Sequence, residues 1–306
     1  MRTGARLALY GAGLVVAFAG AFGIAAAVAP DDIVTASEEG NEMNQHGDGH
    51  ATGPESAESA PELAAALKGL AISIDGYVLS PVEAPAVVGE AEELSFRIED
   101  AAGDTVTDYT TSHDKQLHLI VVRSDGTGFR HVHPELDDST GTWSLPWEWT
   151  DAGTYRVFAD FTPADGEGIT ISRTVQVAGD FAPVASEPSQ VDEVDGFTVS
   201  LEGAVVAGSA SELTISISRD GEPVTALEPY LGAFGHLVAL REGDLAFLHV
   251  HAEGDEPQAG DTAGPEITFF AEAPTAGRYL LYLDFQVDGE VHTASFVVDA
   301  EHGDHS

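Results

Sequence analysis

Two short stretches of the chain each carry a pair of histidines separated by one residue. They are "FRHVHPE", residues 129–135, and "FLHVHAE", residues 247–253. In a β-strand, residues i and i+2 point to the same face about 6.6 Å apart, so both rings of such a pair can turn toward one ion. The pairs therefore indicate metal binding by neutral imidazoles, which suit Cu(II), Zn(II) and Ni(II).

A third histidine precedes each pair at the same distance along the chain. The segments between them, "RSDGTG" and "REGDLA", have the composition of hairpin turns. We therefore expect the strand of the third histidine to run antiparallel beside the His-x-His strand and bring three rings together. The predicted ligand sets are His118, His131 and His133 in the first half, and His236, His249 and His251 in the second. The spacing leaves open whether they form two separate sites or one shared site.

Three further residues are candidates near these sets. His113 precedes the first set only, because the second half has Leu231 at that place. Asp160 and Asp284 occupy matching positions in "ADF" and "LDF". A carboxylate there is predicted to orient an imidazole from behind, outside the ligand shell; the alternative is that it hydrogen-bonds a neighbouring turn.

The histidines also have an interpretation without metal. A histidine beside an apolar run such as "LIVV" is often a hydrogen-bonded core residue, and the protein would then be an interaction or structural module of the cell envelope. Both repeats keep three histidines at the same spacing, and this favours metal ligands over packing residues. We interpret His292 as structural, and we expect solvated linker positions for His46, His50, His302 and His305.

The elements that must position the histidines repeat along the chain. Residues 75–98, 117–133 and 151–161 match residues 195–217, 235–251 and 275–285. Each copy contains short β-rich runs between turn signals, at the spacing of a sandwich. The sequence therefore predicts an all-β fold with two tandem immunoglobulin-like β-sandwich domains, at 70–178 and 191–299, a linker at 179–190 and a tail at 300–306.

The amino terminus predicts export. Arg2 and Arg6 precede an uncharged apolar run from Leu7 to Ala29, and two aspartates follow at once. Positive charge before such a run and negative charge after it place the rest of the chain outside the membrane. We expect a signal-anchor helix at 1–30 and a disordered, acidic, His-containing tether at 31–69. Cleavage near Ala25–Ala27, which would release a secreted protein, is the alternative.

Composition excludes several classes of function. The formal net charge of −40 argues against nucleic-acid binding, which needs clustered lysine and arginine. The absence of cysteine excludes disulfides, thiolate zinc sites, iron–sulfur clusters and blue-copper centres. With only two methionines, Met1 and Met43, a thioether Cu(I) site is disfavoured. No hydrolase elbow, phosphate loop or His-Glu-x-x-His motif occurs, so we expect no enzyme, with copper-dependent redox activity as a minor alternative.

The whole arrangement resembles a group of actinobacterial membrane-anchored or secreted proteins labelled as heavy-metal-binding or uncharacterised. The likeness is carried by "RLALYGAGL", the acidic tether and the tandem "HLIVVR" and "GHLVAL" units with their His-x-His pairs. It implies metal binding. We therefore expect an extracytoplasmic protein that buffers, sequesters or hands on an ion, copper first and zinc second, attached to the membrane by its helix; any envelope protein partner is unknown.

Overall fold

The computed structural model describes residues 69–303, except 165, 255 and 259 and the side chains of His249 and His251. The predicted anchor helix 1–30, residues 31–68 of the tether, and His46, His50 and His305 lie outside the described residues. Within the described part the chain forms strands and turns, and none of its elements is a helix suited to crossing a membrane. Both repeats belong to one compact unit.

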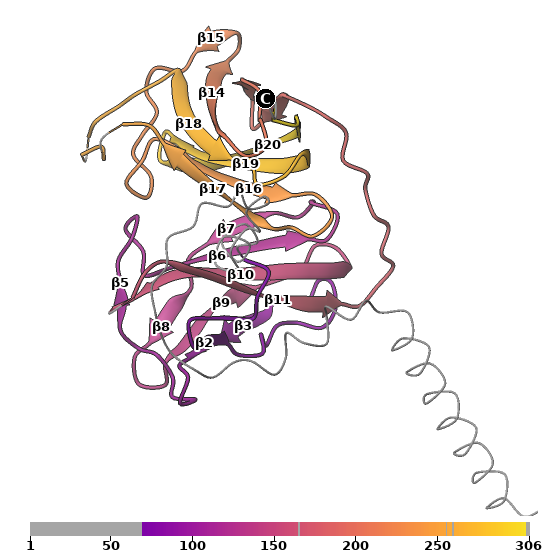
Figure 1. Cartoon of the computed structure of the whole chain (residues 1–306), viewed down its shortest axis with the longest axis vertical. Helices are drawn as coiled ribbons and strands as arrows, with labels where there is room; N and C mark the ends of the chain where they lie inside the picture. The colour runs from indigo at the N-terminus through magenta and orange to yellow at the C-terminus, as the bar shows by residue number, and fades with distance from the viewer. Residues whose placement is uncertain (1–68, 165, 255, 259, 304–306) are drawn as a thin grey trace, which may run out of the picture. The chain divides into compact units, whose positions relative to one another are not determined.

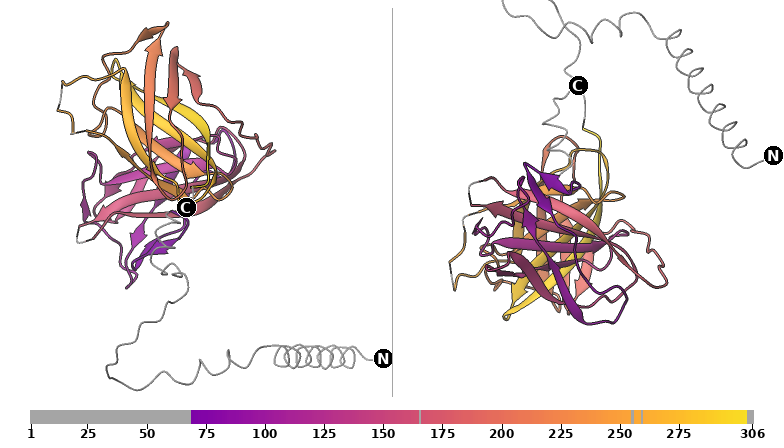
Figure 2. Two further views of the ribbon diagram at one scale, coloured as in Figure 1. Left: turned by 45° about the horizontal axis from the view of Figure 1, so that its top comes forward. Right: turned by 90° about the horizontal axis from the view of Figure 1, so that it is seen from below.

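The strands of the first repeat are β1 (Ser73–Ile74), β2 (Tyr77–Leu79), β3 (Glu92–Phe96), β4 (Ile98–Glu99), β5 (Tyr109–Thr110), β6 (Leu117–Arg123), β7 (Arg130–Val132), β8 (Glu135–Asp137), β9 (Thr142–Trp147), β10 (Gly153–Pro163) and β11 (Ile169–Val177). Those of the second are β12 (Val191–Val194), β13 (Phe197–Glu202), β14 (Ala210–Arg219), β15 (Glu222–Pro223), β16 (His236–Arg241), β17 (Phe247–Ala252), β18 (Glu266–Glu272), β19 (Gly277–Val287) and β20 (Glu290–Ala300). Each set gathers into its own sandwich (Figures 1 and 2). The prediction of two tandem immunoglobulin-like β-sandwiches is confirmed.

The first repeat packs separate sheets around one core. One sheet has the order β11-β10-β6-β7, with β5 beside β10; a second has β3-β9-β8 and a small one β1-β2-β4. Three tryptophans meet in the apolar core between them, Trp143, Trp147 and Trp149. Strand alternation explains this core, because every second side chain of β6 and β10 points into it.

The second repeat joins its strands in one hydrogen-bonded path, β12-β13-β14-β18-β17-β16-β19-β20, with β15 beside β14. The path turns over at β17, whose first residues pair with β16 and whose later residues pair with β18. Its two halves enclose one core, since apolar side chains of β13, β14 and β18 share a cluster with those of β16, β19 and β20.

The inner strands are covered on both faces. β6 is buried along its whole length, although only one of its faces points into its own core. Its other face, with the equivalent faces of β10, β16 and β19, forms a cluster to which both repeats contribute. We call it the docking cluster: Ile120, Val122, Phe158, Val238, Leu240, Leu245, Leu280 and Tyr282.

The two repeats meet through equivalent surfaces. Phe129 stacks on Tyr282 with ring centroids 4.0 Å apart, and Phe247 lies 5.9 Å from Phe158. Phe129 and Phe247 hold the same position in the two repeats, as do Phe158 and Tyr282. Each repeat therefore uses the same face to contact the other.

Replacing Trp149 by alanine tests the packing of the first core. Trp149 is 2% exposed, and its indole N–H donates to the carbonyl of Pro85 at 2.8 Å. The Trp149→Ala change should lower the free energy of unfolding by about 3–5 kcal/mol, because it leaves a cavity and an unpaired carbonyl. Guanidinium unfolding measures the loss, and Val184→Ala, at a side chain 56% exposed, should stay within about 0.5 kcal/mol of the parent. Equal midpoints for the two variants would contradict this description of the core.

Candidate metal centre

The hairpins expected around the histidines are present in both repeats. β6 pairs antiparallel with β7, with Ile120 opposite His131, and β16 pairs with β17 in the same register. Val132 packs on the core of the first repeat, so His131 and His133 on either side of it face the opposite way. They share that face with His118 and the docking cluster.

A tight turn before β6 fixes the ring of His118. Ser112 and Lys115 exchange both backbone hydrogen bonds, and the residues between them, His113 and Asp114, have φ of 50° and 61°. This is the backbone of a type I′ turn, and His and Asp tolerate its left-handed conformation better than most residues. The carbonyl of Ser112 accepts a hydrogen bond from His118 Nε2 at 3.1 Å.

The second repeat builds the same turn before His236. Tyr230 and Ala233 exchange backbone hydrogen bonds across Leu231 and Gly232, which both have positive φ. His236 Nε2 donates to the carbonyls of Tyr230 and Leu231, at 3.0 and 2.9 Å. The first histidine of each set is therefore held by its own turn.

Three ring nitrogens of the first repeat converge. His118 Nδ1 lies 3.0 Å from His131 Nε2 and 3.1 Å from His133 Nε2. The three candidate ligand atoms all lie within 4.8 Å of one another. Two nitrogens on a tetrahedral ion at zinc–nitrogen bond lengths are separated by roughly 3.3 Å, so the rings stand close to ligand geometry.

The second repeat supplies the partner of His131. Asp284 Oδ2 accepts a hydrogen bond from His131 Nδ1 at 2.8 Å, and each of the two side chains is only 4% exposed. The other oxygen of Asp284 accepts from the Thr293 hydroxyl at 2.5 Å. Among the described residues, no ion pair joins Asp284 to lysine or arginine. The sequence offers two roles for Asp284, orienting an imidazole or hydrogen-bonding a neighbouring turn. In the structure it contacts an imidazole, and that imidazole belongs to the other repeat.

The outer partners determine where the ring protons lie. Carbonyl and carboxylate oxygens only accept, so His118 carries its proton on Nε2 and His131 carries its proton on Nδ1. With both rings neutral, the lone pairs of His118 Nδ1 and His131 Nε2 face each other at 3.0 Å. Neutral rings form no hydrogen bond in that arrangement, whereas a cation between them would accept both lone pairs.

Burial favours the neutral form of His118, His133 and His236. Burial first, and then the charge that His131 would carry, lowers the pKa of His118 to about 3. The same causes in the same order lower the pKa of His133 to about 3 and that of His236 to about 4. At pH 7 all three side chains are therefore in the form that binds a metal ion.

Histidines of both repeats gather at this end of the docking cluster. The ring centroid of His236 lies 6.3 Å from that of His131 and 5.3 Å from that of His113. His113 is exposed at the tip of its turn, and its ring lies 6.2 Å from that of His118. The ring of His113 thus lies near both His118 of the first set and His236.

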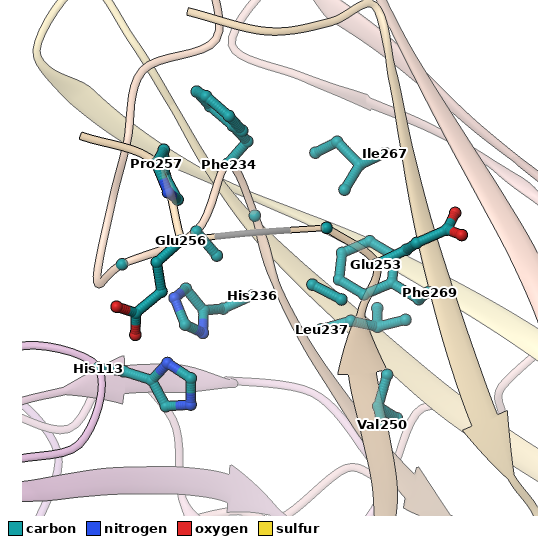
Figure 3. Close-up of a pocket in the computed structure, with 15 residues that line it drawn as sticks. His113, Phe234, His236, Leu237, Val250, Glu253, Glu256, Pro257, Ile267 and Phe269 are labelled. Atoms are coloured by element: carbon teal, nitrogen blue, oxygen red, sulfur yellow. The ribbon is translucent and has the colours of Figure 1, made fainter. Parts of the chain in front are cut away.

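A cavity of about 230 Å³ opens beside His113 and His236 (Figure 3). Its lining includes core side chains and two carboxylates: Phe234, Leu237, Ile267 and Phe269, with Glu253 and Glu256. In the first repeat Trp143, which donates to the Tyr109 hydroxyl at 3.2 Å, stands where the second has Ile267. The smaller side chain explains why the second core has room at this end.

Pro134 makes the two His-x-His segments differ. In the first repeat β7 ends at Val132, and β8 begins at Glu135 in another sheet. Ala252 stands at the equivalent place in the second repeat, where β17 runs unbroken to that residue. Proline has no N–H to donate to a strand ladder, which explains the break.

The second predicted set is described only in part. The backbone of His249 and His251 lies in β17, opposite Glu272 and Phe270 of β18, but their side chains lie outside the described part of the chain. Asp160 pairs with His118 across β10 and β6 and accepts a hydrogen bond from Thr170 at 2.7 Å. Asp284 pairs with His236 and accepts from Thr293 in the same way.

The remaining described histidines lie elsewhere. His292 packs against both Phe197 and Phe285, and its Nδ1 lies 2.9 Å from Asp195 Oδ2. His302 is exposed near the carboxyl terminus. Neither ring is among those that gather beside His131.

Two features of the centre escape reasoning from the sequence. The first is the hydrogen bond from His118 to the backbone carbonyl of Ser112, which residue types do not predict, although "TTSHDKQLH" has the polar composition of a turn. The cross-repeat contact of Asp284 depends on docking. A signal for that docking exists in "LHLIVV", whose apolar residues do not alternate with polar ones, as expected for a strand buried on both faces.

Comparisons with known proteins identify a family without a known function. The family described as "Domain of unknown function (DUF8832)" matches residues 72–179 and 192–302. No curated protein matches the chain. Among solved structures, the chain is similar to fibronectin(III)-like modules of Clostridium thermocellum CbhA, with 9% identity over 75% of this chain and 97% of that chain and a TM-score of 0.20.

Two further solved structures match similar shares of the chain. A mutant of Salmonella alpha-2-macroglobulin is 16% identical over 77% of this chain and 15% of that chain, with a TM-score of 0.24. The BSP domain of a biofilm-associated protein is 11% identical over 74% of this chain and 30% of that chain, with a TM-score of 0.22. The family match, in contrast, spans both repeats and more than half of the chain. The chain therefore belongs to the DUF8832 family and carries two copies of its domain.

Proposed function

We propose that this protein binds a transition-metal ion outside the cytoplasmic membrane, copper first and zinc second, and buffers, sequesters or hands on that ion. The observation that carries the proposal is the close approach of His118 Nδ1 and His131 Nε2, which lie 3.0 Å apart while the other nitrogen of each ring contacts an oxygen acceptor. His133 Nε2, 3.1 Å from His118 Nδ1, would provide the third ligand.

The donor set favours these metals. Three neutral imidazoles without thiolate or thioether suit Cu(II) and Zn(II). A carboxylate behind a ligating imidazole is the arrangement that raises the basicity of the ligand, and Asp284 stands in that position behind His131. The net charge of −40 would draw cations toward the protein.

We extend the proposal to a second site at His236, His249 and His251. Its support is internal equivalence: His236 follows the same turn as His118, and its hairpin has the same register. Asp160 would stand behind an imidazole of this site as Asp284 does in the first, from the matching position on β10. Placement outside the membrane rests on the charge pattern at Arg2–Asp32.

Metal content tests the proposal. Protein purified without an affinity tag and loaded with Cu(II) or Zn(II) should retain about two equivalents after desalting, measured by mass spectrometry of the metal. His131→Ala should retain about one, and the double change His131→Ala with His249→Ala none. His302→Ala, at an exposed histidine, should match the parent.

The opposite result supports the other function. If the parent retains no metal, and added ions leave its melting temperature unchanged, the histidines are packing residues. The protein is then better described as an interaction module of the cell envelope.

A further inference from the structure

The carboxylate that holds the first candidate site comes from the second repeat. Asp284 lies on β19, whereas the ring it contacts, His131, lies on β7. We propose that Asp284 is a positioning residue of the first metal site and that a bound ion fastens the two repeats together. This inference rests on the proposed function of that site.

The hydrogen bond gives Asp284 its positioning role. Because Nδ1 of His131 donates to the carboxylate at 2.8 Å, the ring presents Nε2 toward His118 and is held in one orientation. A metal ion on Nε2 withdraws electron density from the ring and makes the Nδ1–H a stronger donor. Occupancy of the site therefore strengthens a bond that runs between the repeats.

The surroundings of Asp284 also favour a bound cation at the first site. Its carboxylate is buried and accepts hydrogen bonds from Thr293 and His131, without lysine or arginine among its described partners. A buried carboxylate is costly unless positive charge balances it. A divalent ion on the far side of the His131 ring supplies that charge.

Docking and metal binding are therefore linked in both directions. The docking cluster holds the repeats together by apolar contact, and Tyr282 adds a hydrogen bond from its hydroxyl to the carbonyl of Gly126 at 2.5 Å. If the ion tightens this contact, the contact must raise the affinity for the ion by the same factor. The first site is thus complete only when the second repeat is docked on it.

A matched pair of variants tests this inference in full-length protein whose second site is disabled by His249→Ala. In that background Asp284→Asn should weaken Cu(II) binding 10–100-fold, measured by competition with a chromogenic chelator. Asp160→Asn makes the same charge change at the equivalent position of the other repeat and should change the affinity less than about threefold. If each carboxylate served its own repeat, the order of the two effects would be reversed, and the inference would be wrong.

Two readouts separate positioning from a structural effect. Pulsed EPR of the Cu(II) form detects the remote nitrogen of a coordinated imidazole, and its couplings should change in Asp284→Asn and not in Asp160→Asn. Amide hydrogen exchange in β19 should slow on adding Cu(II) to the His249→Ala protein, although its intact site lies in the first repeat, and Asp284→Asn should abolish this protection. Unchanged β19 exchange overturns the inference, whereas a His249→Ala protein that binds no metal overturns the proposed function.

Discussion

Saturating Cu(II) or Zn(II) should raise the melting temperature of the metal-free protein by roughly 10 °C. An ion that binds the folded chain at about 100 times its dissociation constant adds about 2.7 kcal/mol of stability per site. Two sites would add about 5 kcal/mol, and each kcal/mol shifts the melting temperature of a chain this size by about 2–4 °C. The unfolded chain, with twelve histidines, also binds some metal, which keeps the expected shift at the low end.

Differential scanning calorimetry with and without a chelator measures this shift. The His131→Ala, His249→Ala double variant keeps ten of the twelve histidines and should lose nearly all of the stabilisation. His302→Ala should keep it. A shift of equal size in the double variant would mean that the ions bind elsewhere on this acidic chain, and the two proposed sites would be wrong.

Metal-free protein should lose stability between pH 7 and pH 5. Burial lowers the pKa of His118 and His133 to about 3 and that of His236 to about 4, against about 6.5 in an unfolded chain. Below pH 6.5 the unfolded chain therefore binds protons that the folded chain does not, so stability falls as the pH falls until the folded values are reached. A fully shielded histidine contributes about 2 kcal/mol to the loss at pH 5, and because His133 and His236 are partly exposed we expect about 3 kcal/mol from the three together.

Urea unfolding at pH 7, 6 and 5 measures the loss. Carboxylates such as Asp125 and Asp244 do not change charge between pH 7 and pH 5. Burial raises their pKa values, but hydrogen bonds, chiefly those from Arg123 and Arg241, lower them further. His133→Gln removes one of the three groups and should reduce the slope of stability against pH. A slope that is flat in the parent, or identical in the variant, would show that these rings take up protons in the folded state.

Much of the local structure follows from residue types and spacing. The duplication, the hairpins at 117–133 and 235–251, and a common face for His131 and His133 all rest on the strand period of two and on glycine-containing turns. The convergence of His118 with that pair follows from antiparallel pairing, since the register of a hairpin is set over a few residues. These features depend on residues that are close together in the chain, so they can be predicted from a single sequence.

The relations between the repeats do not follow in this way. Nothing in the spacing tells that Asp284 reaches His131 or that His236 approaches His113, because both contacts depend on which sheet faces dock. The break at Pro134 is predictable from proline chemistry, but the transfer of the chain to another sheet there depends on the sandwich as a whole. Ile267, which matches Trp143 of the first repeat, lines the cavity beside His236, and this cavity is visible only once the cores are packed.

The two repeats dock through equivalent faces, and this bears on how such a chain is assembled. Two equivalent faces that fit each other have the arrangement of a symmetric dimer interface, in which the same surface patch of each copy contacts the other. In the tandem protein the connecting segment joins the two halves of such an interface and keeps each half at high effective concentration for the other. The two halves differ while keeping this contact: the first has a proline after its histidine pair, and the second has none of the three tryptophans that fill the core of the first.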